Sequence, residues 1–239
     1  MLNVFVSGLE RQSGKTIVAA GLAATMQSLC YSTSYYKPIQ TGANALNGIV
    51  LSQDTALVNL FDSNIKTGFS YAFPSILSPL VGAYEVNSKV DISKIYNDYQ
   101  SNIQMTDCHI IEGSNSISAP ITEKETEIDL IKTLGLPMLL ILNPKRSAID
   151  DVILGINYIS TNKVNLLGVI INEFDENSSN LEEKYFPQII KEYTNVNILG
   201  TLPNYGNISN ITPDTLIADI LNKVNIEEVF GLKIAKLNS

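Results

Sequence analysis

The feature that most constrains this chain is the segment from Gly8 to Thr16, GLERQSGKT, which follows a short apolar run and precedes a long helical pattern. A loop of this composition turns its backbone N–H groups toward phosphates, and the N-terminus of the following helix adds positive potential. In such loops the lysine neutralises the outer phosphates and the Thr hydroxyl binds Mg²⁺. The segment therefore predicts a nucleotide site built on Lys15 and Thr16.

Short apolar runs alternate with helical patterns along the sequence, which is typical of βαβ units that form a parallel sheet. The predicted strands are Asn3-Ser7, Ser34-Lys37, Cys108-Ile111, Met138-Leu142, Leu167-Ile171 and Ile198-Thr201. The predicted helices are Thr16-Cys30, Thr55-Phe61, Ile92-Ile103, Ile149-Ser160, Leu181-Tyr193 and Pro213-Val224. We expect an α/β fold with a doubly wound, mostly parallel sheet of the P-loop NTPase class. No linker divides the chain, so we expect one domain over residues 1–239.

The amino-acid composition limits the functions and the partners that this chain can have. Of the 239 residues 45% are hydrophobic and 17% are charged, which is typical of a globular protein with a large core. The net charge of −8 disfavours nucleic acid or an anionic membrane as a partner, although a local cluster of donors is enough to bind a small anion. The start of the chain lacks a basic signal region and no apolar run is long enough to span a bilayer, so we expect a cytoplasmic protein.

Ligands of doubly wound sheets bind at the carboxyl ends of the strands, so the residues just after each predicted strand are the candidates for a site. Lys37 ends the second predicted strand, Glu112-Gly113 follows the third, and Asn172 follows the fifth. Each of these residues has a structural explanation when it is taken alone, such as an ordinary exposed strand end for Lys37 or a solvated turn for Glu112. Together they offer complementary charges at one sheet edge, which favours a catalytic site.

The order and spacing of these motifs resemble dethiobiotin synthetases. That family also has five residues between the two loop glycines, where the common P-loop has four. The segment from Lys37 to Gly42, KPIQTG, is similar to the motif that ends the family's second strand, and Asp54 and Glu112-Gly113 are similar to its acidic positions. The later landmarks that resemble the family are Leu134-Gly135-Leu136-Pro137, Asn172 and Leu199-Gly200-Thr201-Leu202-Pro203.

The resemblance implies an ATP-dependent ligase of biotin biosynthesis. Members of the family use ATP and CO₂ to close a ureido ring on 7,8-diaminononanoate, through a carbamate that ATP phosphorylates. By resemblance Lys15 and Lys37 are catalytic, Thr41 and Arg11 contact the substrate, and Thr16, Asp54 and Glu112 hold Mg²⁺. The implied nucleotide-binding residues are Gln12, Ser13, Gly14, Lys15, Thr16, Ile17, Asp54, Glu112, Gly113, Ser114, Asn115, Asn172, Glu173, Pro203, Asn204 and Tyr205. The resemblance also implies a homodimer.

The sequence departs from the family at three places. Arg11 replaces a small hydroxyl, Ser114-Asn115-Ser116 replaces Ala-Gly-Gly, and the segment 147–151 places Asp150 and Asp151 where the family receives the substrate's carboxylate. Like charges there weaken the binding of a carboxylate. Only two arginines occur in the chain, Arg11 and Arg146, and both fall at the predicted ligand edge. These differences leave the ATP machinery intact and leave the substrate open between the family's diamine and another amine.

Two other interpretations compete with a ligase. A nucleotide-dependent dimeric switch ATPase of the ParA/MinD sort has the same architecture, but such proteins carry a lysine near the start of the loop, where this chain has Glu10. A switch also has no need of Lys37 or Thr41. The other interpretation, a non-catalytic binding module descended from an enzyme, is disfavoured because Lys15, Asp54 and Glu112 are all present.

Overall fold

The computed structural model describes residues 2–46, 49–103 and 106–233. Within these ranges one parallel sheet has the strand order β5-β2-β6-β1-β7-β8-β9, and a separate antiparallel pair joins β3 to β4. The strands are β1 (Leu2–Gly8), β2 (Thr33–Thr41), β3 (Asn44–Leu46), β4 (Ile49–Leu51), β5 (Lys66–Phe73), β6 (Cys108–Glu112), β7 (Met138–Leu142), β8 (Leu166–Ile171) and β9 (Ile198–Thr201). The strand β1 lies in the middle, with β6, β2 and β5 on one side and β7, β8 and β9 on the other, which confirms the predicted doubly wound class.

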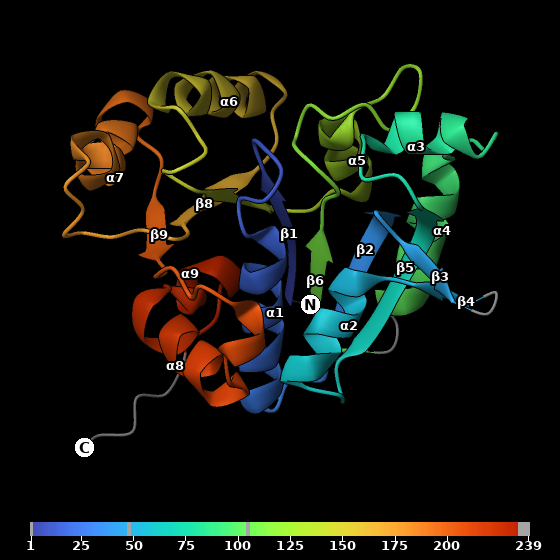
Figure 1. Cartoon of the computed structure of the whole chain (residues 1–239), viewed down its shortest axis with the longest axis horizontal. Coiled ribbons are helices and arrows are strands. Elements are labelled where there is room, and N and C mark those ends of the chain that lie inside the picture. Colours follow the sequence, from blue (N-terminus) through green and yellow to red (C-terminus); the bar gives the residue numbers. More distant parts are fainter. Residues whose placement is uncertain (1, 47–48, 104–105, 234–239) are drawn as a thin grey trace.

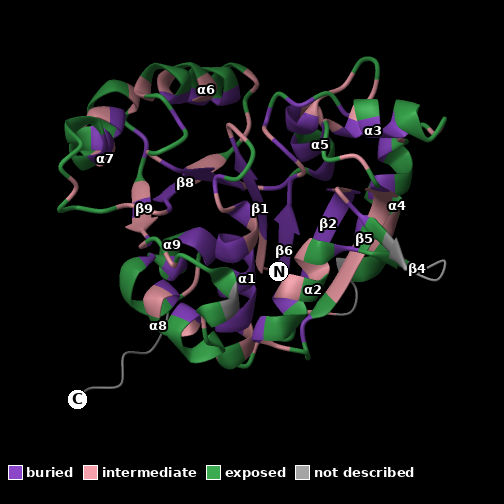
Figure 2. Ribbon diagram, in the orientation of Figure 1, coloured by how far each residue is buried: buried purple, intermediate pink, exposed green. Residues whose placement is uncertain are grey.

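Helices cover both faces of the sheet, as Figure 1 shows. On one face lie α1 (Lys15–Ser28), α2 (Gln53–Phe61), α8 (Pro213–Lys223) and α9 (Ile226–Phe230). On the other lie α3 (Pro79–Glu85), α4 (Ile92–Ile103), α5 (Glu127–Leu134), α6 (Ile149–Thr161) and α7 (Leu181–Thr194). A short 3₁₀ helix, η1 (Ile208–Asn210), precedes α8. Each face packs its own hydrophobic cluster against the strands, and the central strands are buried in Figure 2.

The central strands are buried on both sides, because helices cover both faces of a parallel sheet. The five residues of β6 and the five of β7 are all buried, and β7, Met138–Leu142, appears in the sequence as a continuous apolar run for this reason. The predicted strands and helices are all present, with boundaries that differ by a few residues. The largest difference is β2, which continues through Pro38 to Thr41. Pairing of β2 with β6 ends at Tyr36, so the missing N–H of Pro38 leaves no gap in that ladder.

Several elements lie where the sequence predicted none, namely β3, β4, β5, α3, α5 and α9. Of these, α5 matters most for the site, because its first residue, Glu127, is buried beneath the strand ends. In the described part of the chain, no helix combines the length and the hydropathy that crossing a membrane requires.

Candidate functional site

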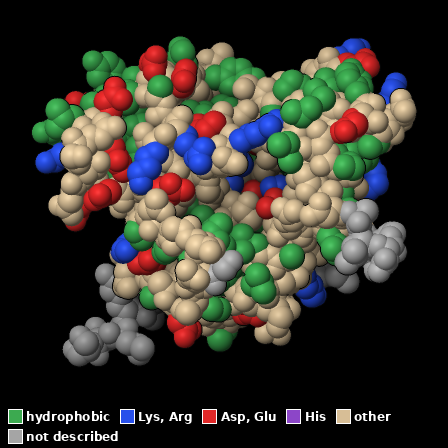
Figure 3. All heavy atoms as spheres, viewed as in Figure 1, with side chains coloured by type: hydrophobic (Ala, Val, Ile, Leu, Met, Phe, Trp, Pro, Cys, Tyr) green, Lys and Arg blue, Asp and Glu red, His purple; other side chains and the backbone are tan. Residues whose placement is uncertain are grey.

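A cleft of about 1310 Å³ opens at the carboxyl ends of the central strands. Figure 3 shows a hollow in the middle of the front face, with Lys and Arg side chains beside it. Most of the predicted site residues line this cleft: Arg11, Gln12, Gly14, Lys15, Thr16, Ile17, Lys37, Thr41, Asp54, Glu112, Ser114, Asn115, Asn172, Glu173, Asn204 and Tyr205. The structure places three others, Ser13, Gly113 and Pro203, outside the lining; Ser13 is fully buried behind the loop.

The loop between β1 and α1 is fixed at both of its ends. Gly14 has a φ of 91°, and a Cβ at this position would lie 2.0 Å from Nδ2 of Asn172, so only glycine fits there. Nδ2 of Asn172 donates a hydrogen bond to the carbonyl of Ser13 at 3.2 Å. At the other end Leu9 packs against α6, where a Cβ on Gly155 would lie 2.5 Å from Cδ2 of Leu9. The backbone of the loop is therefore held between β8 and α6.

Lys15 is buried in the mouth of this loop. Its Nζ donates to the carbonyls of Glu10 at 2.9 Å and of Asn115 at 2.7 Å. Burial lowers the pKa of Lys15, and the negative charges of Glu127 and Glu112 oppose that shift. Hydrogen bonds to ionised acceptors are stronger than those to neutral carbonyls. A phosphate that entered the loop would therefore compete well with these two carbonyls for the ammonium of Lys15.

Lys37 is the centre of a charged cluster beside Lys15. Its Nζ lies 2.5 Å from Oδ2 of Asp54 and 2.7 Å from Oε1 of Glu112. The hydroxyl of Thr16 donates to the same Oε1 at 2.8 Å, and that of Tyr35 donates to Oε2 at 2.7 Å. Burial alone would lower the pKa of Lys37, but the charges of Glu112 and Asp54 outweigh it and raise this pKa, so the group is a cation.

The cluster also bears on metal binding. Two carboxylates, those of Asp54 and Glu112, flank one cation, the ammonium of Lys37, and the hydroxyl of Thr16 is hydrogen-bonded to Glu112. Hydroxyl and carboxylate oxygens are the ligands that Mg²⁺ prefers in proteins. The residues present therefore fit a magnesium site in the type of their donor atoms.

Glu127 is a charged residue of the site that the sequence analysis missed. It is 1% exposed, and its carboxylate accepts hydrogen bonds from the hydroxyl of Ser7 and from the backbone N–H of Ser114. Burial raises the pKa of Glu127, while the Ser7 hydrogen bond and the charge of Lys15 oppose the rise. A Cβ on Gly113 would lie 2.1 Å from Oε1 of Glu127, so the carboxylate needs glycine there. The turn after β6 is therefore held from below by a buried carboxylate.

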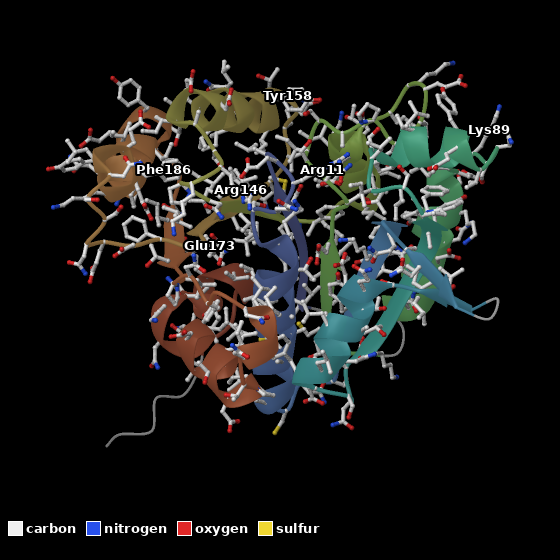
Figure 4. All side chains as sticks on the ribbon, in the orientation of Figure 1. Arg11, Lys89, Arg146, Tyr158, Glu173 and Phe186 are labelled. Atoms are coloured by element: carbon white, nitrogen blue, oxygen red, sulfur yellow. The ribbon has the colours of Figure 1, made fainter. Side chains whose placement is uncertain are left out.

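Arg11 and Arg146 both line the cleft, as predicted from their places at the ligand edge. They are exposed side chains on two adjacent loops, and Figure 4 shows both near the open front of the site. Glu173, which has a φ of 55°, lies below Arg146 in the same view.

Comparison with known proteins places the chain in a family. The model of the AAA_26 family, an AAA domain, matches residues 3–227. The chain belongs to this family of AAA domains. This AAA domain is 27% identical over 229 residues to the ATP-dependent dethiobiotin synthetase BioD of Bacillus subtilis strain 168, with 95% of the chain and 96% of the relative covered. It is also 27% identical to the BioD of Thermodesulfovibrio yellowstonii, over 95% of the chain and 98% of that relative. The resemblance stated from the motifs is confirmed.

Comparison with solved structures shows which proteins share the fold. The MinC:MinD cell division protein complex of Aquifex aeolicus matches with a TM-score of 0.61 at 14% identity, over 100% of this AAA domain and 99% of that chain. MinD of Pyrococcus horikoshii complexed with Mg-ADP matches with a TM-score of 0.57 at 14% identity, over 91% and 89%. At this level of identity the likeness shows a P-loop NTPase fold and nothing of the activity.

Proposed function

We propose that this AAA domain is an ATP-dependent carbon–nitrogen ligase that closes a ureido ring on 7,8-diaminononanoate with CO₂, as a step of biotin biosynthesis. The observation that carries the proposal is the cluster of Lys37, Asp54 and Glu112 beside the phosphate loop. These residues were selected from sequence motifs, and they meet in one cleft. The curated relatives, which are named as dethiobiotin synthetases, support the same activity.

The phosphate loop would bind the triphosphate. Lys15 would exchange its two carbonyl partners for phosphate oxygens, and the loop N–H groups from Gln12 to Ile17 would surround the β-phosphate. Thr16, Asp54 and Glu112 would hold Mg²⁺, which neutralises phosphate charge when it is bound. Lys37 would then leave the two carboxylates and turn to the γ-phosphate and the carbamate.

The base would bind at the carboxyl ends of β8 and β9, where Asn172, Glu173, Pro203, Asn204 and Tyr205 lie. One observation favours adenine. Because Nδ2 of Asn172 donates to Ser13, Oδ1 is left as a buried acceptor without a hydrogen-bond partner among the described residues. The exocyclic amine of adenine is a donor that would satisfy it, whereas guanine presents a carbonyl oxygen at the same position.

In this reaction the protein would contribute mainly by positioning the reactants and by neutralising charge. One amine of the substrate adds to CO₂ to give a carbamate, and a carbamate oxygen attacks the γ-phosphorus of ATP with release of ADP. The second amine then attacks the carbonyl carbon, and phosphate leaves as the ring closes. Lys37 and Lys15 would stabilise the charge on the transferring group, and Thr41 would contact the amine end.

We also propose that the protein is a homodimer and that it works in the cytoplasm. The resemblance implies the dimer, with the substrate held at the subunit interface. Two exposed apolar side chains, one of which lines the cleft, support such a contact. Leu154 on α6 is 67% exposed and Ile76, before α3, is 71% exposed. The likeness to the MinD fold does not by itself favour a switch ATPase. Such switches carry a lysine near the start of the loop, whereas this chain has Glu10 there, which is hydrogen-bonded to Ser147.

The proposal is tested by ADP release in the presence of Mg²⁺ and ATP. We expect release to depend on both 7,8-diaminononanoate and bicarbonate, and to fall by roughly 100-fold or more in Lys15→Ala, because the lost ammonium stabilises transition-state charge. Lys191→Ala is the matched control, since Lys191 is exposed at the end of α7, away from the cleft. Release of ADP at the same rate without the diamine would contradict the ligase and favour a switch ATPase.

A further inference from the structure

Arg11 and Arg146 are held next to one another by their chain neighbours. The hydroxyl of Ser147 donates to Oε1 of Glu10 at 2.6 Å, which ties the loop after β7 to the phosphate loop. Within the loop after β7, the N–H groups of Arg146 and Ser147 both bond to the carbonyl of Asn143, at 2.9 and 2.8 Å. Each arginine is therefore adjacent in sequence to one member of a hydrogen-bonded pair, on a loop whose backbone is fixed.

Both guanidiniums are available to a ligand. Neither forms a hydrogen bond or an ion pair with any residue in the part of the chain that the structure describes, although both line the cleft. The nearest carboxylate along the chain, Glu10, accepts a hydrogen bond from Ser147. Burial raises the pKa of Glu10, and the Ser147 hydrogen bond and the charges of Lys15 and Arg146 oppose that rise. Asp150 and Asp151 lie in the exposed first turn of α6. In a chain of net charge −8, two arginines in one cleft whose guanidiniums have no hydrogen bond or ion pair among the described residues favour an anionic ligand.

The pair lies on the α6 side of the cleft, away from the proposed path of the nucleotide. Leu9, two residues before Arg11, packs on Gly155 of α6. Thr16 belongs to α1, and Tyr205 is hydrogen-bonded to Asp219 of α8, on the opposite face of the sheet. The outer phosphates already have Lys15 and Lys37 as cationic partners. A nucleotide that extends toward Tyr205 therefore leaves the two guanidiniums for a second ligand.

We infer that Arg11 and Arg146 form a carboxylate-binding subsite for the amine substrate. Arginine's planar fork matches a carboxylate with two parallel hydrogen bonds, which a lysine cannot provide. The subsite adjoins the start of α6, and its two guanidiniums supply the positive charge for a carboxylate that Asp150 and Asp151 do not provide. The inference rests on the proposed function for the identity of the amine, but the anion site itself does not depend on turnover.

Chemical modification tests the subsite directly, because phenylglyoxal attacks guanidinium groups and the whole chain has only these two. Peptide mass spectrometry after modification reports each arginine separately. With a non-hydrolysable ATP analogue and Mg²⁺ present, we expect 7,8-diaminononanoate to protect both arginines and its carboxamide to protect neither. Protection of both residues by the nucleotide analogue alone would overturn the inference in favour of a phosphate contact, and so would equal protection by acid and carboxamide.

Steady-state kinetics provide a second, independent test of the subsite. Arg146→Gln is expected to raise the KM for 7,8-diaminononanoate about 10-fold with little change in kcat or in the KM for ATP, and to leave the KM for the carboxamide unchanged. Lys191→Gln, which removes a charge away from the cleft, is the matched control. A KM that rises equally for both amines would overturn the inference.

Failure of the proposed function is distinguishable from failure of the subsite. Pimelate, a dicarboxylate without an amine, serves as the probe. Protection of both arginines by pimelate in a protein that releases no ADP with the diamine would contradict the ligase and uphold the anion site. Full modification of both arginines in the presence of pimelate and of the diamine would overturn the anion site.

Discussion

At the scale of single residues, Asp54 is predicted to bind the metal and to balance the charge of Lys37. Asp54→Asn keeps the size of the side chain and a hydrogen-bond acceptor but removes one of the two carboxylates at the cation. We expect the Mg²⁺ concentration for half-maximal activity to rise by at least about 10-fold, as for other changes around metal ligands. Glu85→Gln, at an exposed position at the end of α3, should leave this concentration unchanged. Equal Mg²⁺ dependence of Asp54→Asn and the wild type would exclude Asp54 from the metal shell.

Glu127 is expected to cost the protein stability at neutral pH, because burial raises its folded-state pKa above the ordinary value of 4.5. A carboxyl group with a raised folded pKa destabilises the fold once the pH rises through that pKa. Glu127→Gln should therefore have a higher Tm than the wild type at pH 7, and the difference should shrink as the pH falls toward 4.5. A less stable variant at pH 7 would show that attraction to Lys15 outweighs the cost of burial.

These residues also mark how far a sequence predicts a site. Lys15 and Thr16 could be found because their spacing is fixed along the chain. Lys37 and Glu112 could be found because both lie near the ligand edge of neighbouring parallel strands, Glu112 at the end of β6 and Lys37 within β2. Glu127 could not be found in this way, since it reaches Ser7 and Ser114 only through the packing of α5. The helix itself had a signal. Thr126 and Asp129 form a capping box, and Gly135 ends the helix in the left-handed region.

At the scale of elements, α6 is predicted to control the phosphate loop through Leu9. Gly155→Ala in a free helix would stabilise it by roughly 0.5–1 kcal/mol. Here the new methyl group would lie 2.5 Å from Cδ2 of Leu9, so we expect a net loss of about 1 kcal/mol and weaker binding of the ATP analogue. Denaturant unfolding and calorimetry measure the two effects. In a Leu9→Ala background the same change should become neutral or stabilising, and an unaltered loss there would show that Leu9 is not the obstacle.

The elements that the sequence missed share a physical reason. Buried strands such as β7 stand out because both faces are apolar, whereas β5 is an edge strand with mostly half-buried or exposed positions and a glycine as its third residue. Its pattern resembles that of a polar loop. The helix α3 has only seven residues, too few to show a helical period. What fails is therefore the detection of short or edge elements, and the central sheet that positions the site is predicted well.

At the scale of the whole molecule, the oligomeric state is the first property to measure, and we expect a homodimer. Light scattering should give twice the 26.2 kDa of one chain. If the cleft lies at the interface, Leu154→Glu on α6 should give monomers, while Leu60→Glu, which is 76% exposed on α2, should leave the dimer intact. A wild-type monomer at assay concentration would contradict the dimer. The one-domain expectation stays a prediction, and a single cooperative unfolding transition would support it.

The most direct test of the ligase uses carbon-labelled bicarbonate and mass spectrometry of the product. With 7,8-diaminononanoate, Mg²⁺ and ATP, we predict a cyclic urea that carries the label in its carbonyl carbon and forms in a one-to-one ratio with ADP. The same mixture with Lys37→Ala should give little product, because the cation that faces the carbamate is lost. ADP formation without a labelled product, at a rate that the diamine does not change, would contradict the proposed activity.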